Sequence, residues 1–234
     1  MDSTTRSDFA ARAYQGGPRA DQAALRRLGG AVRVRLDADP AAWRVPTDRA
    51  EIWAIGEFLS PAECDRLIGL IDSVAKPSTV YDHASQHLYR TSFSGDIDRN
   101  DPFVRMIERR IDDLLGMEPA HGESVQGQRY QPGQEFREHC DWFWTLGEYW
   151  PMEKRRGGQR SWTAMAYLSD VEEGGQTRFN RIGVSVPPQR GALIAWNNAL
   201  PDGTVNLDTM HAALPVVRGT KYVITKWYRT RKWG

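Results

Sequence analysis

Cysteine and long apolar runs are both scarce in this sequence. Of its 234 residues, Cys64 and Cys140 are the two cysteines, which excludes a disulfide-rich scaffold and favours reduced thiols in a cytoplasm. The longest apolar run, residues 192–196, is far shorter than the about 20 residues that a membrane span requires. Residues 1–6 have no apolar segment behind them and do not resemble a secretory signal. We therefore expect a cytoplasmic protein that has no membrane span.

An excess of charge of either sign is missing as well. The chain has 31 Lys and Arg against 30 Asp and Glu, a net charge of +1, which argues against nucleic acid as the main partner. Hydrophobic residues make up 40%, enough for a sizeable core. We expect residues 1–48, which are rich in Ala, Arg and Asp, to be a mobile or loosely docked N-terminal extension of unknown role. Within it, a short helix over 21–28 would end at Gly29 and Gly30.

The remainder, residues 49–234, reads as one domain in which helices precede strands. Ser60, Pro61 and Glu63 form a capping-box pattern that predicts a helix start, and a second helix is predicted over 102–115, before Gly116. The sequence then breaks into short apolar stretches separated by Gly, Pro, Asn and Asp. These predict about eight strands, at 124–130, 136–144, 162–168, 177–179, 184–186, 192–196, 213–217 and 222–227. The pattern indicates a mainly β (α+β) fold.

One strand carries a metal-ligand pattern. Alternation along a strand places His139 and Asp141 on one face and turns Cys140 to the other, so Cys140 is interpreted as a packed thiol. His211 stands beside a later strand, and two histidines with one carboxylate suit Fe(II) while leaving positions open. Lys221 is a single cation in an otherwise apolar strand, where it can hold a carboxylate. The His-x-Asp triplet alone also fits a surface histidine beside an acid.

With these residues in place, the sequence as a whole resembles the prolyl 4-hydroxylase branch of the Fe(II)/2-oxoglutarate-dependent dioxygenases. The resemblance covers roughly residues 59–233. Its motifs are Tyr130-x-x-Gly133-x-x-Phe136-x-x-His139-x-Asp141, Gly157-Gly158-Gln159-Arg160, Ala166-Tyr167-Leu168-Ser169-Asp170-Val171-Glu172-Glu173-Gly174-Gly175-Gln176-Thr177, Pro201-Asp202-Gly203, His211-Ala212-Ala213-Leu214-Pro215 and Lys221. Tyr222 departs from the tryptophan that often follows this lysine.

The resemblance implies both a fold and a set of site residues. The fold is a double-stranded β-helix, or jelly roll, with N-terminal helices packed on one sheet and a metal-binding core at about 124–230. The iron ligands, which are the catalytic residues, are His139, Asp141 and His211. The residues implied for the 2-oxoglutarate carboxylate are Lys221 and Tyr130, and Thr225 can add a hydroxyl from the same strand face as Lys221. Arg160 and Trp227 match positions near the substrate groove.

The implied reaction is hydroxylation of an unactivated C–H bond in a prolyl residue of a peptide or protein. It uses Fe(2+), 2-oxoglutarate and O2, with ascorbate as a reductant, and releases succinate and CO2. Asp141 favours hydroxylation, because halogenating relatives have a small residue in its place. Alternatives are the same chemistry on a free amino acid, a non-prolyl side chain or a natural-product peptide, and, remotely, a non-catalytic jelly-roll binding module. No nucleic acid or membrane partner is expected, and the oligomeric state is left open.

Two further features are ambiguous. His83 and His87 are spaced to share a metal on a helix, but no acidic pattern accompanies them, so ordinary side chains are favoured. Residues 145–160 contain Pro, paired Gly and the basic run Lys154-Arg155-Arg156, which indicates a loop. This loop is either a lid over the substrate or a solvated connection.

Overall fold

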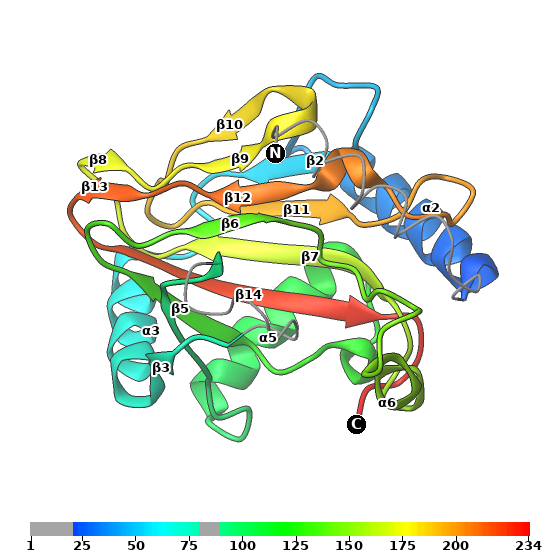
Figure 1. Ribbon diagram of the computed structural model, residues 1–234, viewed down its shortest axis with the longest axis horizontal. Coiled ribbons are helices and arrows are strands. Elements are labelled where there is room, and N and C mark those ends of the chain that lie inside the picture. The colour runs from blue at the N-terminus through cyan, green and yellow to red at the C-terminus, as the bar shows by residue number, and fades with distance from the viewer. Residues whose placement is uncertain (1–20, 80–88) are drawn as a thin grey trace.

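The computed structural model describes residues 21–79 and 89–234, and most of them form sheet with a few helices alongside (Figure 1). The helices are α2 (Gln22–Ala38), α3 (Pro61–Val74), α5 (Pro102–Leu115) and α6 (Trp150–Arg155). Membrane-spanning helices are absent from the described residues, since none is both long and apolar enough.

The strands form one large sheet and one small sheet, which do not close into a barrel. In spatial order, the large sheet contains β1 (Ala42–Arg44), β2 (Ile52–Ile55), β11 (Leu193–Asn197), β7 (Arg160–Tyr167), β14 (Lys221–Arg229), β5 (Gln126–Tyr130), β4 (Phe93–Asp96) and β3 (Lys76–Pro77). The small sheet contains β10 (Val184–Val186), β9 (Thr177–Phe179), β12 (His211–Ala213) and β6 (Phe136–His139). A separate ribbon pairs β13 (Val216–Arg218) with β8 (Glu173–Gly174).

Alternation along the central strands gives the large sheet two different faces. On β7, Trp162 and Ala164 join a buried cluster with side chains of α2, α3 and α5, whereas Met165 and Tyr167 join a second cluster with the small sheet. Successive side chains of a strand point to opposite faces, so each central strand contributes to both cores. The space between the two sheets is therefore lined by every second residue of β7, β11, β14 and β5.

The two predicted helix boundaries are confirmed by their caps. The Ser60 hydroxyl accepts a hydrogen bond from the Glu63 N–H at 3.3 Å, and the Glu63 carboxylate accepts one from the Ser60 N–H at 2.9 Å. α5 ends at Gly116, whose φ of 64° lies in the left-handed region that glycine adopts without strain.

The N-terminal region corrects the sequence prediction. The helix does not end at Gly29 and Gly30: α2 continues to Ala38 and buries Leu25, Val32 and Leu36. Gly29 is needed for close packing, because a Cβ there would lie 2.8 Å from Nδ2 of Asn197. With β1 paired to β2 as well, residues 22–44 belong to the packed fold, and the expected loose docking is wrong for them.

Three segments differ from the predicted strands and loop. β6 ends at His139, although the prediction extended to 144, and 211–218 contains two strands because Leu214 and Pro215 separate β12 from β13. Residues 145–160 are not purely loop, since α6 lies within them. Pro151, which favoured a loop in the sequence, stands in the first turn of α6, where proline is tolerated.

The two adjacent glycines of α2 provide a matched test of its continuity. Gly30→Ala, which meets no atom within 4 Å, is expected to raise the free energy of unfolding by about 0.5–1 kcal/mol, because alanine is the better helix former. Gly29→Ala is expected to lower it by about 1–3 kcal/mol, since the methyl group would overpack against Asn197. Urea unfolding measures both values. Equal destabilisation by the two substitutions would contradict a continuous, docked helix.

Candidate metal centre

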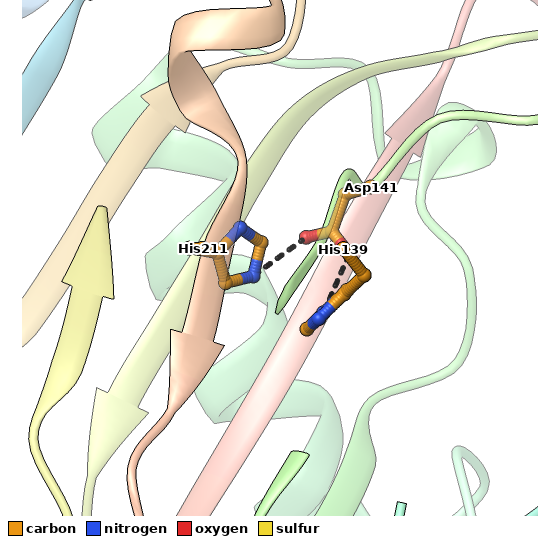
Figure 2. Close-up of side chains that lie close together, drawn as sticks. All are labelled: His139, Asp141 and His211. Carbon is orange, nitrogen blue, oxygen red and sulfur yellow. Dashed lines mark ion pairs between the residues drawn. The ribbon is translucent and has the colours of Figure 1, made fainter. Parts of the chain in front are cut away.

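Strand pairing brings two distant histidines together. β6 and β12 are antiparallel, and His139 stands directly opposite His211 in their register. Asp141 follows β6 by two residues and turns its carboxylate toward both rings (Figure 2). The His139 Nε2 lies 3.8 Å from Asp141 Oδ1, and the His211 Nε2 lies 4.0 Å from Asp141 Oδ2. All three ligand atoms lie within 4.8 Å of one another, close enough to share one ion.

Hydrogen bonds to main-chain carbonyls orient both imidazole rings. Nδ1 of His139 lies 2.8 Å from the Arg137 carbonyl oxygen, and Nδ1 of His211 lies 3.0 Å from that of Thr209. A carbonyl only accepts, so each Nδ1 carries a hydrogen, and in the neutral form of each ring Nε2 keeps its lone pair. Both lone pairs are thus available on the nitrogens that approach Asp141.

The protonation states also suit a metal. Burial, together with the nearby charge of His211, lowers the pKa of His139 to about 3, so its ring is neutral near pH 7. Burial opposes ionisation of Asp141, but the charges of His211, His139 and Arg160 outweigh it and lower the pKa of the carboxyl. Two imidazoles and one carboxylate are the ligand set favoured by Fe(II) in oxygenases. Among the described residues, no other cluster of His, Cys, Asp or Glu is placed to hold an ion.

Aromatic rings enclose the two histidines. Phe136 stacks on His139 with ring centroids 3.6 Å apart, and Trp196 meets His211 edge-on at 4.9 Å. Cys140 is buried but is not one of the three converging groups, and burial raises the pKa of its thiol well above the ordinary value. The structure therefore agrees with its interpretation as a packed thiol.

Lys221 places a buried cation in the same cavity. It is 1% exposed, its Nζ lies 3.3 Å from the Thr177 hydroxyl, and the rings of Tyr130 and Tyr167 lie within 5.6 Å of it. No carboxylate of the described chain lies within ion-pair distance of Nζ, and burial alone lowers the pKa of Lys221 to about 7. An isolated buried ammonium is costly unless an anion joins it, so this end of the cavity suits a carboxylate ligand.

A hydrogen-bonded chain of polar side chains links the other residues implied for this ligand. The Tyr130 hydroxyl donates to Gln128 Oε1 at 2.8 Å, and Gln128 Nε2 donates to the Thr225 hydroxyl at 3.1 Å. Tyr130, Gln128, Thr225 and Lys221 all line the cavity, as does Thr177. Gln128 and Thr177 were not predicted as site residues from the sequence. Gln128 had a usable signal, because it lies two residues before Tyr130 and therefore on the same strand face.

Arg160 and Trp227 lie together beside the cavity. The Arg160 guanidinium packs over the Trp227 ring, 4.0 Å from its centroid, while the indole itself lines the cavity. Glu123 accepts two hydrogen bonds from Arg160, at 2.7 and 2.9 Å, and a third from Arg229. The sequence analysis did not identify Glu123 or Arg229, because neither belongs to the motifs that it considered. The substrate roles of Arg160 and Trp227 stay predictions.

The remaining histidines and the segment 145–160 add no ligand to the described site. His83 and His87 are outside the described residues. His121 is away from the cavity and its Nδ1 lies 3.1 Å from the Arg229 carbonyl oxygen. α6 is anchored rather than loosely connected, since its buried Glu153 accepts a hydrogen bond from Arg229. A lid role for residues 145–160 stays a prediction.

Known proteins resemble this chain in sequence and in structure. The profile of the 2OG-Fe(II) oxygenase superfamily matches residues 125–229. Probable prolyl 4-hydroxylase 10 of Arabidopsis thaliana is 35% identical over 201 residues, which is 75% of this chain and 68% of that protein. Prolyl 4-hydroxylase subunit alpha-1 of Rattus norvegicus is 33% identical over 201 residues, 82% of this chain but 37% of the subunit.

A solved structure gives the same result for the fold. The viral collagen prolyl hydroxylase vCPH from Paramecium Bursaria Chlorella virus-1, in its 2OG complex, is 27% identical with a TM-score of 0.60. The match covers 75% of this chain and 94% of the viral chain.

These similarities and the converging His, Asp and His side chains define an iron- and 2-oxoglutarate-dependent dioxygenase. The chain belongs to the 2OG-Fe(II) oxygenase superfamily, and within it resembles the prolyl 4-hydroxylases. The superfamily uses Fe(2+), 2-oxoglutarate and O2, and the residues present fit the first two. Nε2 lone pairs and a carboxylate suit the metal, and the unpaired Lys221 suits the carboxylate of the cosubstrate.

The position of the Lys221 pKa predicts how cosubstrate binding depends on pH. Lys221 is protonated below about 7 and neutral above it, and only the ammonium form attracts a carboxylate. The affinity for 2-oxoglutarate is therefore expected to be constant below pH 7 and to fall by up to about tenfold per pH unit above it. Anaerobic titration between about pH 6 and about pH 9 measures this dependence. The Lys221→Met variant is expected to bind 2-oxoglutarate weakly, and its affinity should not change with pH. A wild-type affinity that stays constant through this range would contradict the assignment.

Proposed function

We propose that this dioxygenase hydroxylates a prolyl residue of a peptide or protein. The observation that carries the metal assignment is the convergence of His139, Asp141 and His211 within 4.8 Å, with both Nε2 lone pairs directed inward. The prolyl substrate is supported by the relatives, which are prolyl 4-hydroxylases of plants and animals and a viral collagen prolyl hydroxylase.

In this proposal His139, Asp141 and His211 hold Fe(II). When bound, the iron activates O2 at the expense of 2-oxoglutarate, which becomes succinate and CO2, so that one oxygen atom is delivered to a C–H bond. The chain itself contributes two imidazoles and one carboxylate, which would leave the other coordination positions for cosubstrate and O2. Ascorbate as a reductant stays a prediction from the resemblance.

The protein's second contribution is to fix the cosubstrate. Lys221 would pair with its distal carboxylate, and the hydroxyls of Thr177 and Thr225 are available to donate to the same group. Thr225 already accepts from Gln128, so its own hydrogen can be directed to a ligand oxygen. Met165, Trp196 and Val223 complete the wall with buried apolar groups, which limits the water that could compete for Lys221.

The substrate would enter on the side of Trp227. Its indole lines the cavity, and flat aromatic surfaces bind proline rings and extended proline-rich segments well. Arg160, fixed by Glu123 and stacked on the indole, holds that ring in place and adds a cation at the same point. We assign both residues to substrate binding on this basis.

We also assign the two sheets to a double-stranded β-helix with N-terminal helices packed on the large sheet. This assignment is supported by the cluster that α2, α3 and α5 share with the large sheet. The second cluster, between the two sheets, supports it from the opposite face. The site then lies between the sheets, with ligands from the small sheet and the cosubstrate contacts mainly from the large one.

A spectroscopic titration tests the metal and cosubstrate assignments. Anaerobic addition of Fe(II) and 2-oxoglutarate to the purified protein is expected to produce the visible charge-transfer band of a 2-oxo acid chelated to iron. Asp141→Ala should abolish or alter the band, because it removes the one anionic ligand. Asp113→Ala, at an exposed acid of α5, is the matched control and should leave the band unchanged. If the correctly folded wild-type protein gives no band, the result contradicts the proposal.

A peptide assay tests the substrate. A proline-rich peptide incubated with the enzyme, Fe(II), 2-oxoglutarate and O2 is expected to gain the mass of one oxygen atom at proline, with succinate formed in step. The same peptide with alanine at each proline is the control and should gain none. Oxygen incorporated equally into the alanine peptide, or only into another side chain, would exclude the prolyl substrate and leave the iron chemistry standing.

A further inference from the structure

A buried hydrogen-bond chain ends on the carboxylate of Asp141. The Thr163 hydroxyl on β7 lies 2.9 Å from Asp141 Oδ2, and Asn198 Nδ2, directly after β11, lies 2.9 Å from the Thr163 hydroxyl. The three residues are 0–5% exposed, so water does not compete for these bonds. Neither Thr163 nor Asn198 belongs to the proposed ligand set or to the lining of the cavity.

The number of hydrogens on each group fixes which group donates in each of these hydrogen bonds. A threonine hydroxyl has one hydrogen to donate, whereas an aspartate carboxylate has none and can only accept. Thr163 must therefore donate to Asp141, and its oxygen can then only accept from Asn198. This order requires the Asn198 amide to present its nitrogen, as it does here. Asn198 thus forces the single hydrogen of Thr163 toward Asp141 Oδ2.

The main chain of Asn198 also leads to the second histidine. Its N–H donates to the Ser161 carbonyl at 2.8 Å, and its carbonyl accepts from the Asn206 N–H at 3.0 Å. The Asn206 carbonyl in turn accepts from the Thr209 hydroxyl at 2.7 Å, and the Thr209 carbonyl orients Nδ1 of His211. One residue is therefore connected to two of the three groups that face the metal position.

We propose that Thr163 and Asn198 are positioning residues that hold Asp141 in its metal-binding orientation before a metal arrives. The inference rests on the proposed function, because it takes Asp141 as a ligand. Without the Thr163 hydrogen, the carboxylate can rotate away from the two Nε2 atoms, and metal binding must then include the cost of reordering it. Asn198 acts on Asp141 through Thr163, so its side chain should have no separate effect once the hydroxyl is gone.

The test measures binding of Co2+ alone, by its visible absorption, without any turnover. Thr163→Val is expected to weaken Co2+ binding about 10–100-fold, the usual effect of removing a hydrogen-bond partner from a metal ligand. Thr163→Ser keeps the hydroxyl and should bind within about threefold of wild type. Asn198→Ala should weaken binding, and the double substitution Thr163→Val with Asn198→Ala should be no weaker than Thr163→Val alone.

Asn197→Ala is the matched control. Asn197 is an equally buried amide on the opposite strand face, where Nδ2 donates to Glu51 Oε2 at 2.8 Å. The Asn197→Ala substitution should lower the melting temperature of the protein and leave its affinity for Co2+ unchanged. If folded Thr163→Val binds Co2+ as tightly as wild type, or if Asn197→Ala weakens Co2+ binding to the same extent, the inference is wrong. The metal assignment would stand in either case. If wild type does not bind Co2+, or binds it as well after Asp141→Ala, the metal assignment fails and the inference with it.

Discussion

The direct pairing of His139 with His211 across β6 and β12 is the constraint on which the whole site depends. Only an antiparallel register that places these two residues opposite each other brings their rings to a centroid distance of 4.3 Å. A shift of one residue would turn one ring to the other face of the sheet. Because β6 is short and ends at His139, the chain can then turn Asp141 back toward both rings. The metal position is therefore a product of strand register.

Two buried lysines on β14 show how the same strand serves stability and chemistry. Lys226 faces the helices, where its Nζ lies 2.8 Å from Asp112, which also accepts a hydrogen bond from Tyr228. Lys221 faces the space between the sheets and has hydroxyl and aromatic neighbours instead. The odd spacing places the two side chains on opposite faces of the strand. Lys226, whose charge is paired with a carboxylate, belongs to the core. Lys221, which has no carboxylate beside it among the described residues, is suited to bind an anionic ligand.

The sequence allowed the ligand set, the anion-binding lysine and most strands to be predicted, because each depends on local alternation or on a motif. His139 and Asp141 belong to a recognisable His-x-Asp motif, and Lys221 is a single cation in an otherwise apolar strand. Thr177, Thr163 and Glu123 were not found, because their roles arise from contacts between segments that are far apart in the chain. The prediction ended α2 too early, because paired glycines usually end helices. The packing of Gly29 against Asn197 depends on a residue far away in the sequence and is not visible locally.

The unpaired ammonium of Lys221 has a consequence for the lifetime of the protein. A ligand that binds only the folded state stabilises it in proportion to the logarithm of its concentration, by about 2.7 kcal/mol at a hundredfold excess over the dissociation constant. The free protein retains the desolvation cost of Lys221, and the cosubstrate relieves it. Resistance to unfolding and to proteolysis should thus follow the local supply of 2-oxoglutarate. The abundance of the enzyme would then be coupled to metabolism through the same side chain that anchors its cosubstrate.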